Sequence, residues 1–295
     1  MTMIFGVPLA VFMGQLLLGL INGAFYALLS LGLAVIFGLL KIVNFAHGAM
    51  YMLGAFATLL GMRYLGINYW AALLLAPLFV GLFGMLIERF LLRRIAHLDH
   101  LYGLLLTFGI ALILEGTLVN FFGVSGARYP TPEALQGGYQ TGFMFLPKYR
   151  AFVLVAAIVV CLFTWYMIER TRLGAYLRAG TENPALMQAF GVNVPLLITL
   201  TYGFGVALAA FAGVLAAPLY PVSPTMGSNL LIVVFAVVVI GGMGSILGAV
   251  ITGLTMGLIE GLTKVYYPEA ANTVIFLVMI LVLLIRPAGL FGKEA

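Results

Sequence analysis

The chain has 295 residues, of which 64% are hydrophobic and only 8% are charged. Soluble domains carry about 25% charged residues, so this composition excludes an ordinary soluble protein and predicts an all-α polytopic membrane protein. The net charge of +5 does not indicate nucleic-acid binding, because the cations lie singly or in small groups between apolar stretches. Cys161 is the only cysteine, which excludes an intramolecular disulfide and a CxxC metal site.

Long apolar stretches predict individual membrane-spanning helices, because about 20 residues cross the hydrocarbon layer. Each of the following ranges predicts one helix: 8–30, 69–87, 101–122, 151–168, 195–217 and 272–285. With two further discontinuous regions, the expected total is about eight transmembrane helices, with an error of one. They form a single transmembrane domain, 1–295.

The two discontinuous regions predict broken or re-entrant segments near 41–48 and 241–248. Residues 31–62 contain the first break and predict either a short broken helix followed by another or one long discontinuous helix. Residues 229–263 are too long for one span and contain Gly241-Gly242-Met243-Gly244. Two short arms joined by a glycine turn are therefore expected there.

The cations predict which loops face the cytoplasm, because cytoplasmic loops carry an excess of Lys and Arg. The predicted cytoplasmic face carries Arg89, Arg93, Arg94, Arg170, Arg172, Arg178, Arg286 and Lys293. The opposite face carries Arg63, Arg128, Lys148, Arg150 and Lys264. Segment 169–194 is thus predicted to be a cytoplasmic loop and segment 123–150 a long external loop. Lys41 is unassigned, so the side of the N-terminus stays open.

The run 41–48 places an amide, an imidazole and a cation inside an otherwise apolar stretch. Hydrocarbon cannot hydrogen-bond a broken backbone or a bare polar side chain, so such a break is tolerated only inside protein or beside a watery cavity. We therefore predict a solute pathway lined by Asn44, Phe45 and His47, with Asn22 on the preceding span. The alternative is that His47 is a hydrogen-bonded packing residue.

The predicted cytoplasmic loop contains the signals of a short amphipathic helix. Thr181 to Asn183 offer an N-terminal cap, Pro184 suits the first helical turn, and Gly191 is a natural stop. Its apolar face consists of Leu186, Ala189 and Phe190. Such a helix can dock into a groove on a partner protein or lie on anionic lipid, and both roles stay open.

Small residues recur at helical spacing on two predicted spans, which predicts close helix packing rather than a ligand role. The packing positions are Gly205, Ala209 and Gly213 on one span and Gly244, Gly248, Gly253, Gly257 and Gly261 on the other.

Two acidic residues lie within or near predicted spans. Glu260 has Lys264 four residues later, which predicts an ordinary ion pair. Glu115 has no evident partner in the sequence, so it either bonds to a neighbouring helix or couples transport to protons.

No group that could support catalysis occurs at suitable spacing, and the pattern GxxxxGK[ST] that cradles a nucleotide is absent from the sequence. We therefore expect no catalytic residues, no metal site and no cofactor, and any ATP dependence must come from a partner. A membrane-embedded enzyme is disfavoured. A secondary transporter or channel that uses Glu115 is a weaker alternative to a subunit driven by a partner.

Five blocks of the sequence, in order and over almost the whole chain, resemble the LivH-type permease of bacterial ABC importers for branched-chain amino acids. The blocks are residues 44–48, 174–191, 209–217, 241–249 and 286–292. The resemblance implies alternating access in a multi-pass protein of the bacterial inner membrane. It also implies two cytoplasmic ABC ATPases, a second permease of LivM type, a periplasmic or extracellular solute-binding protein, and contact with membrane lipid but not with nucleic acid.

The resemblance also implies residue roles. The loop that contacts an ATPase corresponds to Arg178, Glu182, Asn183, Pro184, Leu186, Phe190 and Gly191. Asn44, Phe45 and His47 match the break near the permeation path. Glu115 stands where related permeases often carry an uncharged amide, so the resemblance assigns it no role. Similar permeases also serve urea and short amides, so the resemblance does not choose the solute.

Overall fold

The computed structural model describes residues 3–4, 6–40, 42–140 and 145–292. Lys41, Lys293 and residues 141–144 of the predicted external loop lie outside the described residues. The described chain is mainly helical, and its only paired strands form two short antiparallel ribbons. The ribbons are β1 (Met3–Ile4) with β2 (Val7–Pro8) and β3 (Gly138–Gln140) with β4 (Phe145–Pro147).

Several helices are long and apolar enough to cross a membrane, which makes this a multi-pass membrane protein. They are α1 (Leu9–Leu40), α3 (Tyr69–Ile87) with its continuation, α5 (His100–Phe122), α6 (Lys148–Arg170), α9 (Val194–Ala216) and α11 (Ile246–Tyr266). Shorter or less apolar helices are α2 (His47–Leu65), α10 (Met226–Gly241) and α12 (Val274–Ile285).

Short elements complete the fold. A π-helical turn, η1 (Glu88–Leu92), and α4 (Arg93–Ile95) continue α3. Two helices, α7 (Arg172–Glu182) and α8 (Pro184–Ala189), make up most of the segment between α6 and α9. Two 3-10 turns, η2 (Glu133–Leu135) and η3 (Pro268–Ala270), lie in connections.

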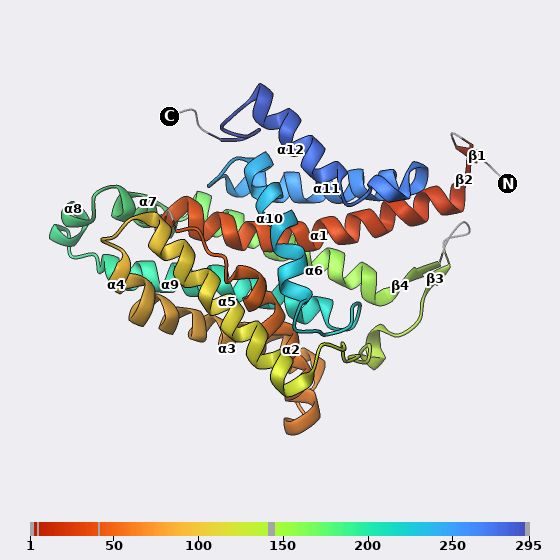
Figure 1. Cartoon of the computed structure of the whole chain (residues 1–295), viewed down its shortest axis with the longest axis horizontal. Helices are drawn as coiled ribbons and strands as arrows, with labels where there is room; N and C mark the ends of the chain where they lie inside the picture. The colour runs from red at the N-terminus through yellow and green to blue at the C-terminus, as the bar shows by residue number, and fades with distance from the viewer. Residues whose placement is uncertain (1–2, 5, 41, 141–144, 293–295) are drawn as a thin grey trace. The chain divides into compact units, whose positions relative to one another are not determined.

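The first helix is longer than the predicted span of 8–30. Figure 1 shows α1 as one long rod, drawn in red, and it continues without interruption to Leu40. The polar break therefore follows this helix, and the chain enters α2 at His47. The prediction for 31–62 was wrong in its first part because residues 31–40 are uniformly apolar and simply extend α1.

The second discontinuity has the predicted glycine turn between two helices, but the helices differ in length from the prediction. Helix α10 ends at Gly241 and α11 begins at Ile246. Gly242 and Gly244 have φ values of +96° and +91°, a conformation that favours glycine, so they form the turn itself. The arm after the turn is not short, because α11 has 21 residues. Gly244 lies outside the helix on which its packing role was predicted.

The described residues form two compact units. The first consists of residues 1–30, 131–161 and 233–295, and the second of residues 31–130 and 162–232. The boundary falls within α1, α6 and α10, and each unit is described separately below. The assignment of 1–295 to a single transmembrane domain stays a prediction.

The second unit is built around α9, which packs on α2 and α3. Gly213 lies against the backbone of Tyr51 and Ala55, and a Cβ at Gly205 would come within 2.6 Å of Ile36 Cγ1. Ala209 is fully buried. The predicted small face of α9 is therefore the face on which the other helices approach it.

In the first unit, α1 and α11 meet through glycines. A Cβ at Gly253 would lie 2.5 Å from the backbone nitrogen of Ala27, and one at Gly257 would collide with the backbones of Gly23 and Gly19. Backbones this close leave no room for side chains, which is why the contact positions are glycines.

Candidate functional site

The break between α1 and α2 is stabilised by side chains rather than by helical hydrogen bonds. Asn44 is fully buried, and its Oδ1 accepts a hydrogen bond from the backbone N–H of Ala46 at 3.1 Å. The hydroxyl of Thr107, on α5, accepts from the backbone N–H of Phe45 at 3.1 Å and lies 3.4 Å from the carbonyl of Val43. Backbone groups of Val43, Phe45 and Ala46 thus find partners inside protein, as a break in hydrocarbon requires.

His47 begins α2 and is fully buried. A Cβ added to Gly32 of α1 would come within 2.9 Å of His47 Cε1 and 2.7 Å of the Gly205 carbonyl oxygen. The imidazole therefore fills the space left by a glycine where α1, α2 and α9 meet. The Phe45 ring meets Phe108 of α5 edge-on, with centroids 6.3 Å apart.

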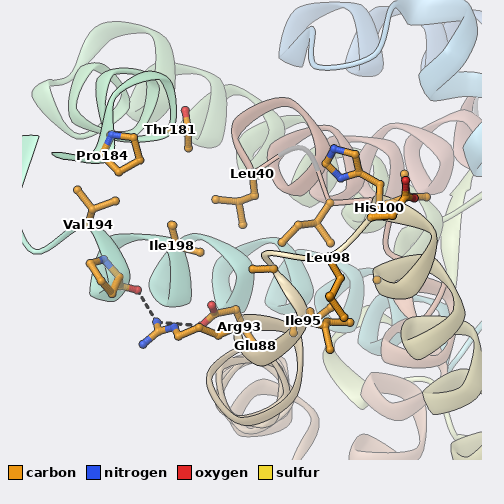
Figure 2. Close-up of a pocket in the computed structure, with 18 of the residues that line it drawn as sticks. Leu40, Glu88, Arg93, Ile95, Leu98, His100, Thr181, Pro184, Val194 and Ile198 are labelled. Atoms are coloured by element: carbon orange, nitrogen blue, oxygen red, sulfur yellow. Dashed lines mark hydrogen bonds and ion pairs between the residues drawn. The ribbon is translucent and has the colours of Figure 1, made fainter. Parts of the chain in front are cut away.

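A cavity of about 370 Å³ lies beside the break. We call it the α8 pocket, and Figure 2 shows it with its labelled side chains. Ile42 and Val43 of the break line it, together with Thr181, Pro184 and Gln188 of α7 and α8. The end of α1, residues 88–103 and the start of α9 complete its wall. The break and the α7–α8 segment thus border the same cavity.

A buried carboxylate in the wall of the α8 pocket bonds the continuation of α3 to α9. The Glu88 side chain is only 3% exposed, and its Oε2 accepts hydrogen bonds from Thr199 Oγ1 at 2.5 Å and from Arg93 Nη2 at 3.3 Å. Arg93 also donates to the carbonyl of Pro195 at 2.7 Å, and Figure 2 shows both of these Arg93 contacts. We call Glu88, Arg93 and Thr199 the clamp. It ties the continuation of α3 to the first turns of α9.

The predicted ATPase-contacting residues fall on α7, α8 and the segment that follows. Asn183 separates the helices, and its Oδ1 caps α8 by accepting from the backbone N–H of Leu186 at 3.0 Å. Pro184 is the first residue of α8. Gly191 lies just beyond the end of this helix and has a φ of +80°. Leu186 and Phe190 expose 53% and 75% of their surfaces. An exposed apolar face on a capped helix is suited to docking.

The remaining two of these residues lie on α7, a helix that sequence reasoning missed. Glu182 is exposed at the end of α7. Arg178 Nη1 lies 3.8 Å from Glu169 Oε2, with both side chains roughly half exposed, so this ion pair contributes little stability.

Asn22 belongs to a different unit from the other predicted pathway residues, Asn44, Phe45 and His47. It lies in the first unit, where its Nδ2 donates to Glu260 Oε1 at 3.2 Å. Tyr26 donates to the other oxygen of Glu260 at 2.6 Å, and Lys264 pairs with the same carboxylate. The predicted ion pair between Glu260 and Lys264 is confirmed, and it belongs to a larger buried network.

Glu115 lies half-buried on α5. Within the described residues, no hydrogen bond or ion pair joins it to a neighbouring helix. The expected bond to another helix is therefore not seen.

Sequence reasoning also missed Thr107 and Thr199. Isolated threonines in apolar helices carry no local signal, because their importance depends on partners 62 and 111 residues away in the chain. Glu88 was visible as an acidic residue at the end of an apolar stretch, but its partners were not.

Comparisons with known proteins bear on this arrangement. The family model described as "Branched-chain amino acid transport system / permease component" matches residues 15–283. No solved structure shows significant similarity to the chain.

Relatives of established description match over nearly the whole chain. The chain is 31% identical to the high-affinity branched-chain amino acid transport system permease protein LivH of Escherichia coli (strain K12), with 96% of both proteins covered. Identity to LivH of Salmonella typhimurium is 30%, with the same coverage. Identity to LivM of Escherichia coli is 28%, covering 90% of this chain and 67% of LivM. The chain therefore belongs to the family of branched-chain amino acid transport system permease components.

Proposed function

We propose that the chain is the permease subunit of an ATP-driven importer for branched-chain amino acids. The observation that carries this proposal is its similarity, over 96% of its length, to proteins named LivH. In this assembly the subunit has no catalytic residues, and two cytoplasmic ATPases hydrolyse the nucleotide. A second permease of LivM type and an external solute-binding protein complete the importer in a bacterial inner membrane. The similarity to LivM supports a pair of related permeases.

The solute pathway in this proposal passes the break. The backbone there is already satisfied by Thr107 and Asn44, so Phe45 and its neighbours can present a weakly polar surface to a passing solute. A hydrophobic amino acid needs such a surface to pass but must not bind tightly, since tight binding slows release. Selectivity then rests with the solute-binding protein.

Energy enters at α8 in this proposal. An ATPase that docks on Leu186 and Phe190 would move a helix that borders the α8 pocket. The same pocket wall also contains Ile42 and Val43, directly before the predicted pathway residues. A shift of α8 therefore changes the shape of the cavity next to the break.

The clamp would carry the same movement into the membrane. Only residues 190–193 separate α8 from α9, and α9 is bonded to the end of α3 through Arg93 and Glu88. Because the buried Glu88 carboxylate bonds both Arg93 and Thr199, α3 and α9 should move together as a rigid pair.

The test is an uptake panel in vesicles that contain the complete transporter and its solute-binding protein. Leucine and valine should accumulate only when ATP is supplied inside, while urea and short amides should not. Vesicles without ATP are the control. Accumulation of urea or acetamide without leucine would replace the proposed solute by the alternative that similar permeases serve. Accumulation without ATP would contradict the proposal itself.

A further inference from the structure

A second cavity of the second unit lies outside the α8 pocket. It encloses about 440 Å³ between α3, α6, α7 and α9. It extends from Pro77 to Met85 along α3, which is about 12 Å at 1.5 Å per residue, and from Leu197 to Ala207 along α9. The cavity is therefore elongated along the helices. We call it the α3–α9 cavity.

The wall of this cavity has almost no polar groups. Among the described lining residues, Thr201 has the only polar side chain, and its hydroxyl donates to the carbonyl of Leu197 at 2.8 Å. Among the described residues of the wall, the Thr201 hydroxyl is the only side-chain hydrogen-bonding group and no side chain is charged, so the cavity does not suit the charged ends of an amino acid. Water is equally disfavoured, because it needs polar partners.

The cavity opens among side chains that are themselves exposed and apolar. Leu78 and Leu200 line it and expose 58% and 49% of their surfaces. In a membrane-spanning segment, such a surface faces lipid tails unless protein covers it. An apolar cavity that is elongated along the helices is a slot that matches the shape of an acyl chain.

Cations stand at the end of the cavity that lies near α7. Ile168 and Leu173 both line it, and the exposed Arg170 and Arg172 lie between them in the sequence. Glu169 lies in the same stretch, but its carboxylate pairs with Arg178. The Arg170 guanidinium lies 5.6 Å from the centroid of the Trp165 ring, an aromatic placed at the end of a span as at a membrane surface. Positive groups at this level attract the phosphate of a lipid whose tail enters the slot.

From the shape, the apolar wall and the adjacent cations, we infer that the α3–α9 cavity holds one acyl chain of an anionic phospholipid, whose phosphate binds Arg172 and Arg170. The lipid would contact Leu173 and Leu177 and so support α7, the helix before α8. Its effect on transport rests on the proposed function, but its binding does not.

The test measures lipid retained by the purified complex, using native mass spectrometry with added phosphatidylglycerol. Leu200→Trp should fill the slot and remove most of the bound lipid. Leu196→Trp is the matched control, because Leu196 lies one turn away on α9, is 51% exposed and does not line the cavity. Leu78→Trp repeats the test from α3 if Leu200→Trp does not assemble.

The headgroup is tested separately. Arg172→Gln should lower the preference for phosphatidylglycerol over phosphatidylcholine about fivefold, the equivalent of about 1 kcal/mol for one interfacial cation. Equal lipid retention in wild type, Leu200→Trp and Leu196→Trp would overturn the inference. Cross-linking of a cysteine at position 200, in a Cys161→Ser background, to the second permease would overturn it too, because protein would then cover the slot. Neither readout requires transport.

Discussion

One hydroxyl group on α5 compensates for hydrogen bonds that the backbone loses between α1 and α2. Thr107 is fully buried and sits within hydrogen-bonding distance of Phe45 N, Val43 O and Leu104 O. A hydroxyl can accept from the amide and donate to one carbonyl at a time. Without it, the amide of Phe45 would lack this partner in a place that water does not readily reach.

Thr107→Val should therefore destabilise the permease by about 1–3 kcal/mol, the usual penalty for leaving a buried polar group unsatisfied. Thr107→Ser keeps the hydroxyl and is the control. Thermal unfolding of the detergent-solubilised complex measures the difference. Equal melting temperatures for the two variants would show that the hydroxyl does not stabilise the break.

The carboxyl groups of Glu260 and Glu115 illustrate opposite situations. Glu260 is buried and has three partners, whereas Glu115 is half-buried and makes no hydrogen bond or ion pair with another side chain of the described residues. A carboxyl that must take up and release a proton would need to be accessible, so Glu115 is the residue on which a secondary-transport mechanism would depend.

We expect Glu115→Gln to leave ATP-driven uptake within about twofold of wild type, since a partly exposed carboxyl on α5 contributes little to packing. Leucine uptake in vesicles with and without a proton gradient is the measurement. Abolished uptake in a fully assembled complex would favour proton coupling instead.

At the scale of helices, the glycines decide where two backbones can touch. Gly257 faces backbone atoms of Gly23 and Gly19, whereas Gly116 of α5 has no atom within 4 Å of the position of a Cβ. An added methyl group would therefore clash with the neighbouring backbone at position 257 but would meet open space at position 116.

Gly257→Ala should cost about 1–3 kcal/mol because the methyl group forces α1 and α11 apart. Gly116→Ala should be neutral or slightly stabilising, since alanine favours the helix. Their melting temperatures can be compared directly. A Gly257→Ala variant as stable as Gly116→Ala would show that the α1–α11 contact is looser than the structure indicates.

The form of helix α8 follows from local chemistry, and its proposed docking role follows from the exposure of its apolar face. The Asn183 cap, Pro184 and Gly191 fix its ends, so a side-chain change on its apolar face should not unfold it.

Phe190→Ser should reduce co-purification of the ATPases about tenfold or more, as expected when a large aromatic is lost from a docking surface. Tyr64→Ser is the control, because Tyr64 is 71% exposed at the end of α2, on the face predicted to be external. Similar losses in both variants would mean that Phe190 acts through stability rather than docking.

At the scale of the whole molecule, the order of the helices bears on sidedness. If α1, α2, α3, α5, α6, α9, α10, α11 and α12 each cross the membrane once, their ends alternate between the two faces. Arg63, Arg128 and Lys264 then share one face, and Arg170 and Arg286 share the other, as the distribution of cations predicts. On this assumption we predict that the start of α1 lies on the external face, a side that the sequence alone left open.

Single cysteines in a Cys161→Ser background test this topology with a maleimide that cannot cross the membrane. Ala10→Cys should be labelled in intact cells, like the external reference Ser125→Cys. Ala185→Cys on α8 should be labelled only after permeabilisation. The proposed topology fails if Ala10→Cys behaves like Ala185→Cys.

The sequence alone determined the class of the protein, most of the spans, the two breaks and the form of α8. These features depend on composition, on apolar run length and on residues within a few positions of one another, such as Asn183 and Pro184. The sequence determined the ends of the helices less closely. Residues 31–40 extend α1 because this stretch contains no proline and no polar residue that would end the helix.

Only the tertiary structure decided which distant groups meet. The bonds of Thr107 to the break, of Thr199 to Glu88 and of Asn22 to Glu260 join residues that are 62, 111 and 238 positions apart. In hydrocarbon, a polar group must find its partner within the protein, and helix packing chooses that partner. A single sequence contains no local trace of such a choice, so the clamp, the α8 pocket and the α3–α9 cavity became visible only in three dimensions.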